Sequence, residues 1–153
     1  MALSKEDKQI LFDSHYFESG KKSKLSGYSN YFASIEDIFE KAFVQLLIIK
    51  VNPKHVLDIG YGKGTLIYYF RQYGVDAVGV NVSKYIILNS PVKEPIRWVD
   101  LDNEKLPFPD DYFNLIVSRQ SIEHISNLKN ALHEVHRVLD KNGYFIFRRT
   151  HSV

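Results

Sequence analysis

The chain has 153 residues, 44% of them hydrophobic and 25% charged, which fits one domain with a hydrophobic core and leaves no room for a second domain. Its 20 basic and 18 acidic side chains give a formal net charge of +2, so nothing in the composition favours a nucleic-acid partner. The absence of cysteine excludes disulfides, thiolate metal sites and a cysteine nucleophile.

The N-terminal residues 1–13 carry charges throughout and lack the apolar core of a signal peptide. No apolar run in the chain is long enough to cross a bilayer. We therefore expect a cytoplasmic protein without a membrane span.

Residues 1–33 are predicted to form an N-terminal arm that precedes the main domain at 34–153. The stretch 18–31 is polar, with scattered tyrosines and glycines. One interpretation is a mobile arm, which is typical of polar segments near a terminus. The other is a lid, in which Tyr16, Tyr28 and Tyr31 close over a ligand.

A helix is predicted after Ser34, because Asp37 follows three residues later as in a capping box. Asn52-Pro53 is expected to end this helix. Its apolar positions recur at helical spacing, so the helix should pack on a sheet. They are Ile35, Ile38, Phe39, Ala42, Phe43, Leu46 and Leu47.

The next segment, residues 55–65, reads as a buried strand, a glycine-rich turn and the start of a helix. Such a turn at the carboxyl end of a parallel strand is where open α/β sheets bind ligands. A dinucleotide fingerprint is G-x-G-x-x-G, whereas the third glycine, Gly64, comes one residue early here. This spacing disfavours a nicotinamide-dependent oxidoreductase, although the turn alone is compatible with other nucleotide binders.

Helical and strand patterns then alternate to the end of the chain. We expect strands at 77–80, 96–99 and 144–147 and one ending at Ser118, with helices at 65–73, 83–89 and 131–143, the last closed by an Asn-Gly turn. This alternation predicts a Rossmann-like, doubly wound parallel sheet with strand order 3-2-1-4-5 and helices on both faces.

The run Asp58-Ile59-Gly60-Tyr61-Gly62-Lys63-Gly64 resembles the first motif of the class I S-adenosylmethionine (SAM)-dependent methyltransferases. The stretches 106–118 and 122–125 resemble the fourth-strand region of the methyltransferase type-11 group. The resemblance covers residues 55–149 in order and spacing. It implies SAM as the cofactor and a site formed by Asp58, Gly60, Tyr61, Gly62, Gly64, Asn81, Val82, Asp100, Leu101 and Ser118.

The resemblance also implies a role for each of these corners. Asp58 faces the ammonium group of SAM directly or through water. Asn81 stands where the family commonly has an acid that binds both ribose hydroxyls, so ribose binding is expected in a weaker form. Val82 packs on the adenine ring, and Asp100, followed by Leu101, accepts from the adenine amine.

The expected reaction is methyl transfer from SAM to a small-molecule or glycan-type acceptor, since the region from Tyr16 to Tyr31 loosely resembles glycan- and envelope-modifying methyltransferases. A base is needed only for poor nucleophiles. His124, Glu123 and His15 are the candidates, and His124 can equally be a packing residue. We expect no metal site.

The chain stops just after the fifth strand, whereas the family fold continues with another helix and two strands. Residues 144–149 would then be an exposed apolar edge. We expect either a homodimer through this edge, a partner subunit that covers it, or a fragment of a longer protein. A non-catalytic SAM-binding module, or a truncated methyltransferase that needs a partner, is the alternative function.

Overall fold

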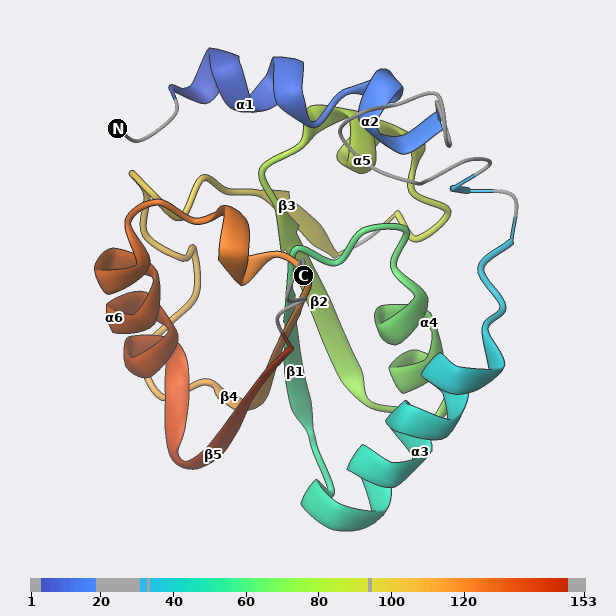
Figure 1. The fold of residues 1–153 in the computed structure, drawn as a ribbon. Coiled ribbons are helices and arrows are strands. Elements are labelled where there is room, and N and C mark those ends of the chain that lie inside the picture. Colours follow the sequence, from blue (N-terminus) through green and yellow to red (C-terminus); the bar gives the residue numbers. More distant parts are fainter. Residues whose placement is uncertain (1–3, 19–30, 33, 94, 149–153) are drawn as a thin grey trace.

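The computed structural model describes residues 4–18, 31–32, 34–93 and 95–148 (Figure 1). Among these residues, no helix is long and apolar enough to cross a membrane. The elements are α1 (Lys5–Leu11), α2 (Ser14–Glu18), α3 (Ile38–Val51), β1 (His55–Ile59), α4 (Thr65–Gln72), β2 (Asp76–Asn81), α5 (Lys84–Asn89), β3 (Ile96–Trp98), β4 (Phe113–Arg119), the 3-10 helix η2 (Ile122–His124), α6 (Leu128–Val138) and β5 (Leu139–Arg148).

The five strands form one parallel sheet in the order β3-β2-β1-β4-β5, which confirms the predicted fold class and strand order. Figure 1 shows α3 and α4 on one side of the sheet and α6 on the other. Two hydrophobic clusters, one under each helical layer, make up the core. The sheet is therefore covered by helices on both faces. The strand order reverses beside the central strand β1.

The apolar residues of strand β1, Val56, Leu57 and Ile59, point to both faces of the sheet, because both faces are covered. Val56 packs in the cluster under α3 and α4, whereas Leu57 and Ile59 pack in the cluster under α6. All three side chains are buried. The chain leaves the sheet at Gly60, directly at the carboxyl edge.

The prediction that Ser34 opens a helix was wrong, because α3 begins three residues later than the capping box implied. Asp37 caps it instead, accepting hydrogen bonds from the backbone N–H groups of Phe39 and Glu40. Val44 and Leu47 form the buried face. Four of the apolar positions expected to pack are exposed, namely Ile38, Phe39, Ala42 and Leu46.

The helix predicted at 131–143 ends earlier, at Val138, and β5 follows without a glycine cap. The strand register jumps from Phe113 opposite Leu139 to Leu115 opposite Tyr144, so residues 140–143 are left out of the ladder. Asn142 N–H donates to the Asp140 side chain within this excursion. The Asn-Gly pair therefore belongs to an irregular stretch near the start of β5 and does not close the helix.

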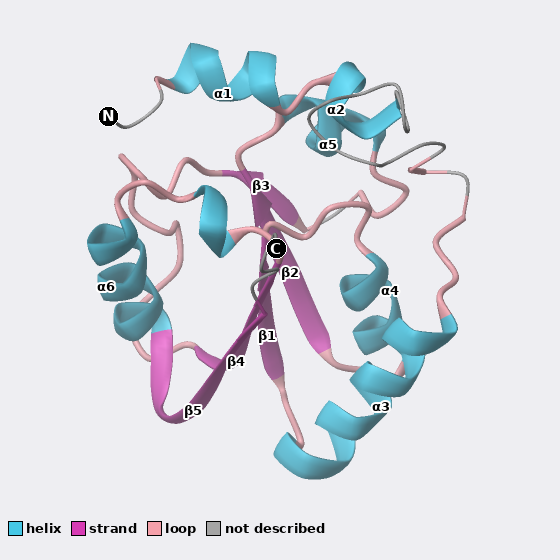
Figure 2. Cartoon of the chain, viewed as in Figure 1, coloured by secondary structure: helices cyan, strands magenta, loops and turns pink. Residues whose placement is uncertain are grey.

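The described part of the N-terminal arm contains α1 and α2, which lie across the carboxyl ends of the strands (Figure 2). Ser4 and Asp7 form a capping box at the start of α1. Phe12 and Phe17 are buried in the cluster shared with α4 and α5. The arm thus contributes to the core, and residues 19–30, including Tyr28, lie outside the described residues.

Candidate cofactor site

A cavity of about 510 Å³ lies between the carboxyl ends of the strands and the helices α1 and α2. Ten of the predicted site and lid residues line it: Tyr16, Tyr31, Gly60, Tyr61, Gly62, Asn81, Val82, Asp100, Leu101 and His124. Asp58, Gly64 and Ser118 do not line it. The elements of the sheet therefore bring most of the predicted residues to one place.

The turn after β1 requires glycine because neighbouring side chains lie very close to its backbone. Gly60 and Gly62 have φ of +74° and +55°, values that favour glycine. A Cβ on Gly60 would overlap the side chain of Ser121, and one on Gly62 would overlap the hydroxyl of Tyr31. Tyr31 thus lies directly over the turn.

Gly64 has a different role, although it belongs to the same motif. It is the N-cap of α4 with φ of +88°, and a Cβ there would come within 2.7 Å of the Val92 side chain. Gly64 does not line the cavity, so glycine is needed here for packing against Val92. Only the first two glycines face the cavity.

Asp58 lies in β1 behind the glycine turn and is almost fully buried. Its carboxylate makes no hydrogen bond to any described residue. Burial raises its pKa to about 7, the positive charge of Arg119 acts in the opposite direction, and the negative charge of Glu40 adds to the increase. A ligand cation near this carboxylate would favour its ionised form.

Glu40 in α3 and Arg119 at the end of β4 form an ion pair beside Asp58, and both line the cavity. One atom of each, Glu40 Oε2 and Arg119 Nε, is buried without a hydrogen-bond partner among the described residues. The hydroxyls of Tyr61 and Thr65 are in the same situation. Buried polar atoms in proteins usually have partners, so these four indicate where a polar ligand fits.

Ser118 is buried and acts through Ser121. Ser121 Oγ donates to the carbonyl of Ile59 at 2.8 Å, so the 2.8 Å bond between the two hydroxyls must have Ser118 as its donor. This chain fixes Ser121 against the glycine turn. Gln120, between the two serines, has φ of +55°, a conformation that is uncommon for non-glycine residues and concentrates at functional sites.

The predicted adenine corner contains two acids and a buried lysine from α1. The Lys8 ammonium donates to the carboxylates of Asp100, at 2.5 Å, and of Asp102. Asn103 donates to the second oxygen of Asp100 at 2.9 Å. Burial opposes ionisation of Asp100, but the hydrogen bonds from Lys8 and Asn103 outweigh it and lower the pKa of this carboxyl.

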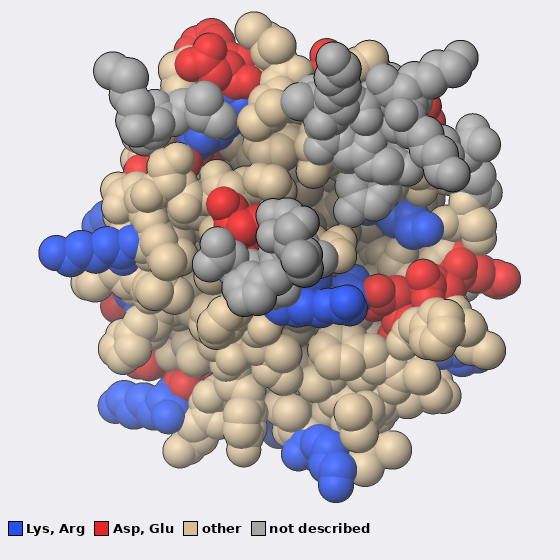
Figure 3. Space-filling view, viewed as in Figure 1, with Lys and Arg blue, Asp and Glu red and all other residues tan. Residues whose placement is uncertain are grey.

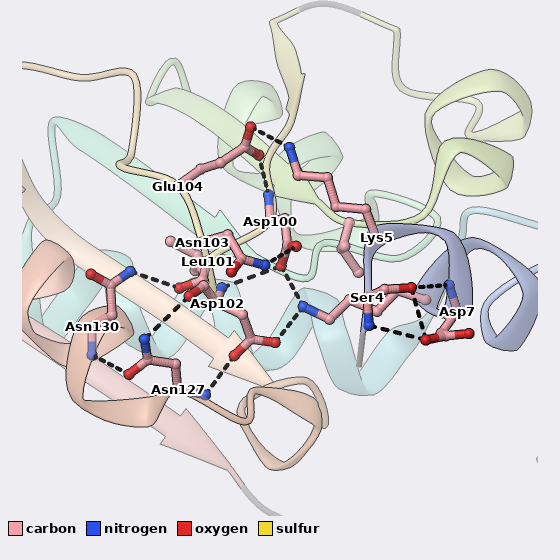
Figure 4. Close-up of polar contacts among 12 residues, drawn as sticks. Ser4, Lys5, Asp7, Asp100, Leu101, Asp102, Asn103, Glu104, Asn127 and Asn130 are labelled. Carbon is pink, nitrogen blue, oxygen red and sulfur yellow. Dashed lines mark hydrogen bonds and ion pairs between the residues drawn. The ribbon is translucent and has the colours of Figure 1, made fainter. Parts of the chain in front are cut away.

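Figure 4 shows how the loop after β3 is tied to the start of α6. The Asn127 N–H donates to the Asp102 carboxylate at 2.5 Å, and the Asn130 amide donates to the carbonyl of Leu101 at 2.9 Å. This corner is therefore held on both sides, by α1 and by α6.

The predicted ribose corner is also connected to the N-terminal arm. Asn81 Oδ1 accepts from the N–H of Ser83 at 2.9 Å. The carbonyl of Val82 accepts from Trp98 Nε1 at 2.7 Å and from Gln9 Nε2 at 2.5 Å. The α1 helix is thus bonded to the end of β2 as well as to the loop after β3.

The candidate bases lie in different environments in the structure. His124, in η2, lines the cavity, and its ring packs edge-on against Phe12 with centroids 5.2 Å apart. His15 is exposed, and so are His133 and His136 on α6. Within the described ranges, no three His, Asp or Glu side chains are grouped to hold a metal ion.

Sequence reasoning missed Lys8, Glu40, Asp102 and Ser121 as members of the site. The capping box Ser4-x-x-Asp7 is a local signal for α1, but nothing local shows that Lys8 points inward. Glu40 lies in a helix remote from the motif.

On the face drawn in Figure 3, basic and acidic side chains are interspersed, and neither sign forms a continuous patch among the residues described there.

Comparison with known proteins identifies the family. Residues 57–147 match the model of a methyltransferase domain, Methyltransf_11. The chain is 35% identical over 97 residues to the uncharacterized methyltransferase YcgJ of Bacillus subtilis, covering 60% of this chain and 38% of that protein. It is 32% identical over 93 residues to the mitochondrial arginine-hydroxylase NDUFAF5 of Rattus norvegicus, covering 59% and 27%.

Among solved structures, the PH0226 protein of Pyrococcus horikoshii OT3 superimposes with a TM-score of 0.60 at 26% identity, covering 76% of this chain and 61% of that one. The chain thus spans less than half the length of the two curated relatives. The matched segment contains the glycine turn and all five strands except their outermost residues. The chain belongs to the methyltransferase type-11 group of the class I SAM-dependent methyltransferases.

Proposed function

We propose that the chain binds SAM in the cavity at the carboxyl edge of the sheet and transfers its methyl group to a small-molecule or glycan-type acceptor. The observation that carries this proposal is the group of charges around the glycine turn. Asp58 lies behind the turn, and Glu40 Oε2 and Arg119 Nε beside it have no partner among the described residues. The ammonium of SAM fits the acceptors on Asp58 and Glu40, and the carboxylate of SAM fits the donor on Arg119.

The same charges argue against a nicotinamide dinucleotide. A dinucleotide places its pyrophosphate at the glycine turn, where the positive end of the helix attracts it. Here the buried Asp58 carboxylate lies behind the turn and the Glu40 carboxylate lines the cavity, and both would repel a dianion. The early third glycine and this electrostatic argument point in the same direction.

The remaining corners would hold the adenosine part. Asn81 would meet the ribose with its amide, since its oxygen already accepts from Ser83. Val82 and Leu101 offer apolar walls for the adenine ring, and Asp100, bonded to Lys8, lines the same cavity. The cavity volume of about 510 Å³ falls within the range typical of cofactor sites.

SAM, when bound, supplies a methyl group on a sulfonium, an already activated carbon. The residues of this chain then have to align the acceptor and exclude water. Tyr16 and Tyr31, with α1 and α2, cover the cavity and would serve as the lid. His124 is the residue that we propose as a base for a hydroxyl acceptor, because it lines the cavity.

A non-catalytic or differently catalytic SAM-binding module is the second candidate. It is favoured by the relative named as an arginine hydroxylase, which shows that similar domains carry different activities. Calorimetric titration with SAM, S-adenosylhomocysteine and NAD tests the binding proposal, and NAD binding without SAM binding would refute it. Release of S-adenosylhomocysteine in a screen of acceptors then separates a methyltransferase from a binding module.

We also propose that the fifth strand forms a contact between chains, in a homodimer or with a partner subunit. In the described sheet β5 is an edge strand, and Tyr144 and Phe147 on it are 55% and 58% exposed. Unpaired backbone groups beside exposed aromatic rings favour strand pairing. Phe145 and Ile146 pack into the two core clusters, so they are not part of this proposed contact.

A further inference from the structure

The ion pair between Glu40 and Arg119 joins α3 to the end of β4, and both residues line the cavity. Arg119 Nη1 donates to Glu40 Oε1. Phe43, one turn further along α3, lies 5.8 Å from the guanidinium carbon, in cation-π contact. Two residues of one helix face therefore fix the position of a single arginine.

This pair leaves one hydrogen-bonding atom of each partner unused. Glu40 Oε2 is an acceptor and Arg119 Nε–H is a donor, and both are buried without a partner among the described residues. Leaving a buried charged group partly unsatisfied is unfavourable, so a structural ion pair would be expected to use these atoms. Because both residues line the cavity, a bound ligand that brings both a donor and an acceptor would satisfy these atoms.

Asp58 determines the charge of that ligand. Its carboxylate lies near enough to Arg119 and Glu40 for both charges to act on it. With all three groups ionised, the cluster carries two negative charges and one positive charge. An α-amino-carboxylate complements it, because an ammonium offsets the surplus carboxylate while a carboxylate meets the guanidinium.

We propose that Glu40 and Arg119 are specificity-determining residues for the amino-acid end of the cofactor. Glu40 Oε2 accepts from the ammonium group, and Arg119 Nε donates to the carboxylate. This inference rests on the proposed function, because it assumes that SAM binds in this cavity. It extends the expected role of Asp58 to two residues outside the glycine motif.

The test compares three ligands that share the adenosine part. S-adenosylhomocysteine carries the ammonium and the carboxylate, its decarboxylated analogue carries only the amine, and 5′-methylthioadenosine carries neither. By calorimetry, Arg119→Gln should weaken S-adenosylhomocysteine about 10- to 100-fold and change the other two by less than about threefold. Glu40→Gln should weaken both amine-containing ligands and spare 5′-methylthioadenosine.

Controls separate recognition from folding. Arg71, whose guanidinium donates to the Ala77 carbonyl outside the cavity, provides the matched variant Arg71→Gln, which should change no affinity. Arg119→Lys keeps the charge without Nε and should recover part of the affinity for S-adenosylhomocysteine. Thermal unfolding of each variant identifies any that fails to fold. If Arg119→Gln fails to fold, Glu40→Gln and Arg119→Lys still give the ligand pattern.

Two results would overturn the assignment. Equal losses for all three ligands, or no loss for any, would show that the pair has only a structural role while SAM binding itself stands. A wild-type protein that binds none of the three would refute the proposed function, and this inference with it.

Discussion

The ammonium of Lys8 lies 2.5 Å from the carboxylate of Asp100, although the two residues are 92 positions apart in the chain. Both side chains are almost fully buried. Burial opposes the charge of Lys8, but hydrogen bonds to Asp100 and Asp102 outweigh it and raise the pKa of the lysine. The first helix is therefore anchored at the corner where we place the adenine amine.

Lys8→Met should destabilise the protein strongly. It leaves two buried carboxylates without their counter-charge, and breaking a buried ion pair from one side typically lowers the free energy of unfolding by about 3–5 kcal/mol. Urea unfolding at pH 7 measures this change. Lys5→Met is the matched control, since Lys5 pairs with Glu104 at a partly exposed position and its loss should lower the stability by less than about 1 kcal/mol. Equal losses would contradict the proposed anchoring role of Lys8.

The sheet could be predicted from the sequence because each strand is a short apolar run followed by a helical pattern. Val56, Leu57 and Ile59 show this directly, since a strand covered on both faces needs no alternation. The boundaries were less predictable. Ser34 and Asp37 are both good capping residues, and only tertiary packing decides between them.

The candidate site could be predicted only where it is local in sequence. Gly60 and Gly62 belong to a continuous motif, and Asn81 and Asp100 follow strands that end at the same edge of the sheet. Lys8 and Glu40 could not be predicted, because a charged helical residue is usually solvated and its burial depends on a partner far away in the chain.

The stability of the protein should depend on pH through Asp58. Its pKa is about 7 in the folded state and near 3.8 when exposed, so between these values the folded state holds a proton that the unfolded state has released. Raising the pH from 4 to 7 should therefore lower the free energy of unfolding, by up to roughly 4 kcal/mol from this group. The stability of Asp58→Asn relative to the wild type should rise over the same interval. A difference that stays constant between pH 4 and 8 would exclude this linkage.

Binding of SAM should weaken as the pH falls below 7 for the same reason. Protonated Asp58 no longer attracts an ammonium. The groups that face it are Glu40 from α3, Arg119 from β4 and Tyr61 from the turn. Calorimetry at pH 6 and 8 measures the affinity, with 5′-methylthioadenosine as the ligand that should be insensitive. An equal pH effect on both ligands would assign it to another group.

Asn81→Asp should strengthen SAM binding. The aspartate can keep the bond from the Ser83 N–H with one oxygen and offer the second, charged oxygen to a ribose hydroxyl. Charge-assisted hydrogen bonds are roughly twice as strong as neutral ones, so the affinity should rise by about 3- to 30-fold. Calorimetric titration of both proteins gives the comparison. An unchanged or weaker affinity would remove Asn81 from the ribose corner.

Phe147→Lys should disrupt the dimer that we propose through β5. Phe147 is exposed at the sheet edge beside Phe145, with ring centroids 5.5 Å apart, so a lysine there adds charge to the contact without opening the core. Edge strands commonly use lysine to prevent pairing. Analytical ultracentrifugation at micromolar concentration should show a wild-type dimer and a monomeric variant with unchanged thermal stability. Phe39→Lys, at an exposed aromatic on α3, is the control that should leave the dimer intact. A wild-type chain that sediments as a monomer with and without SAM would refute self-association through β5.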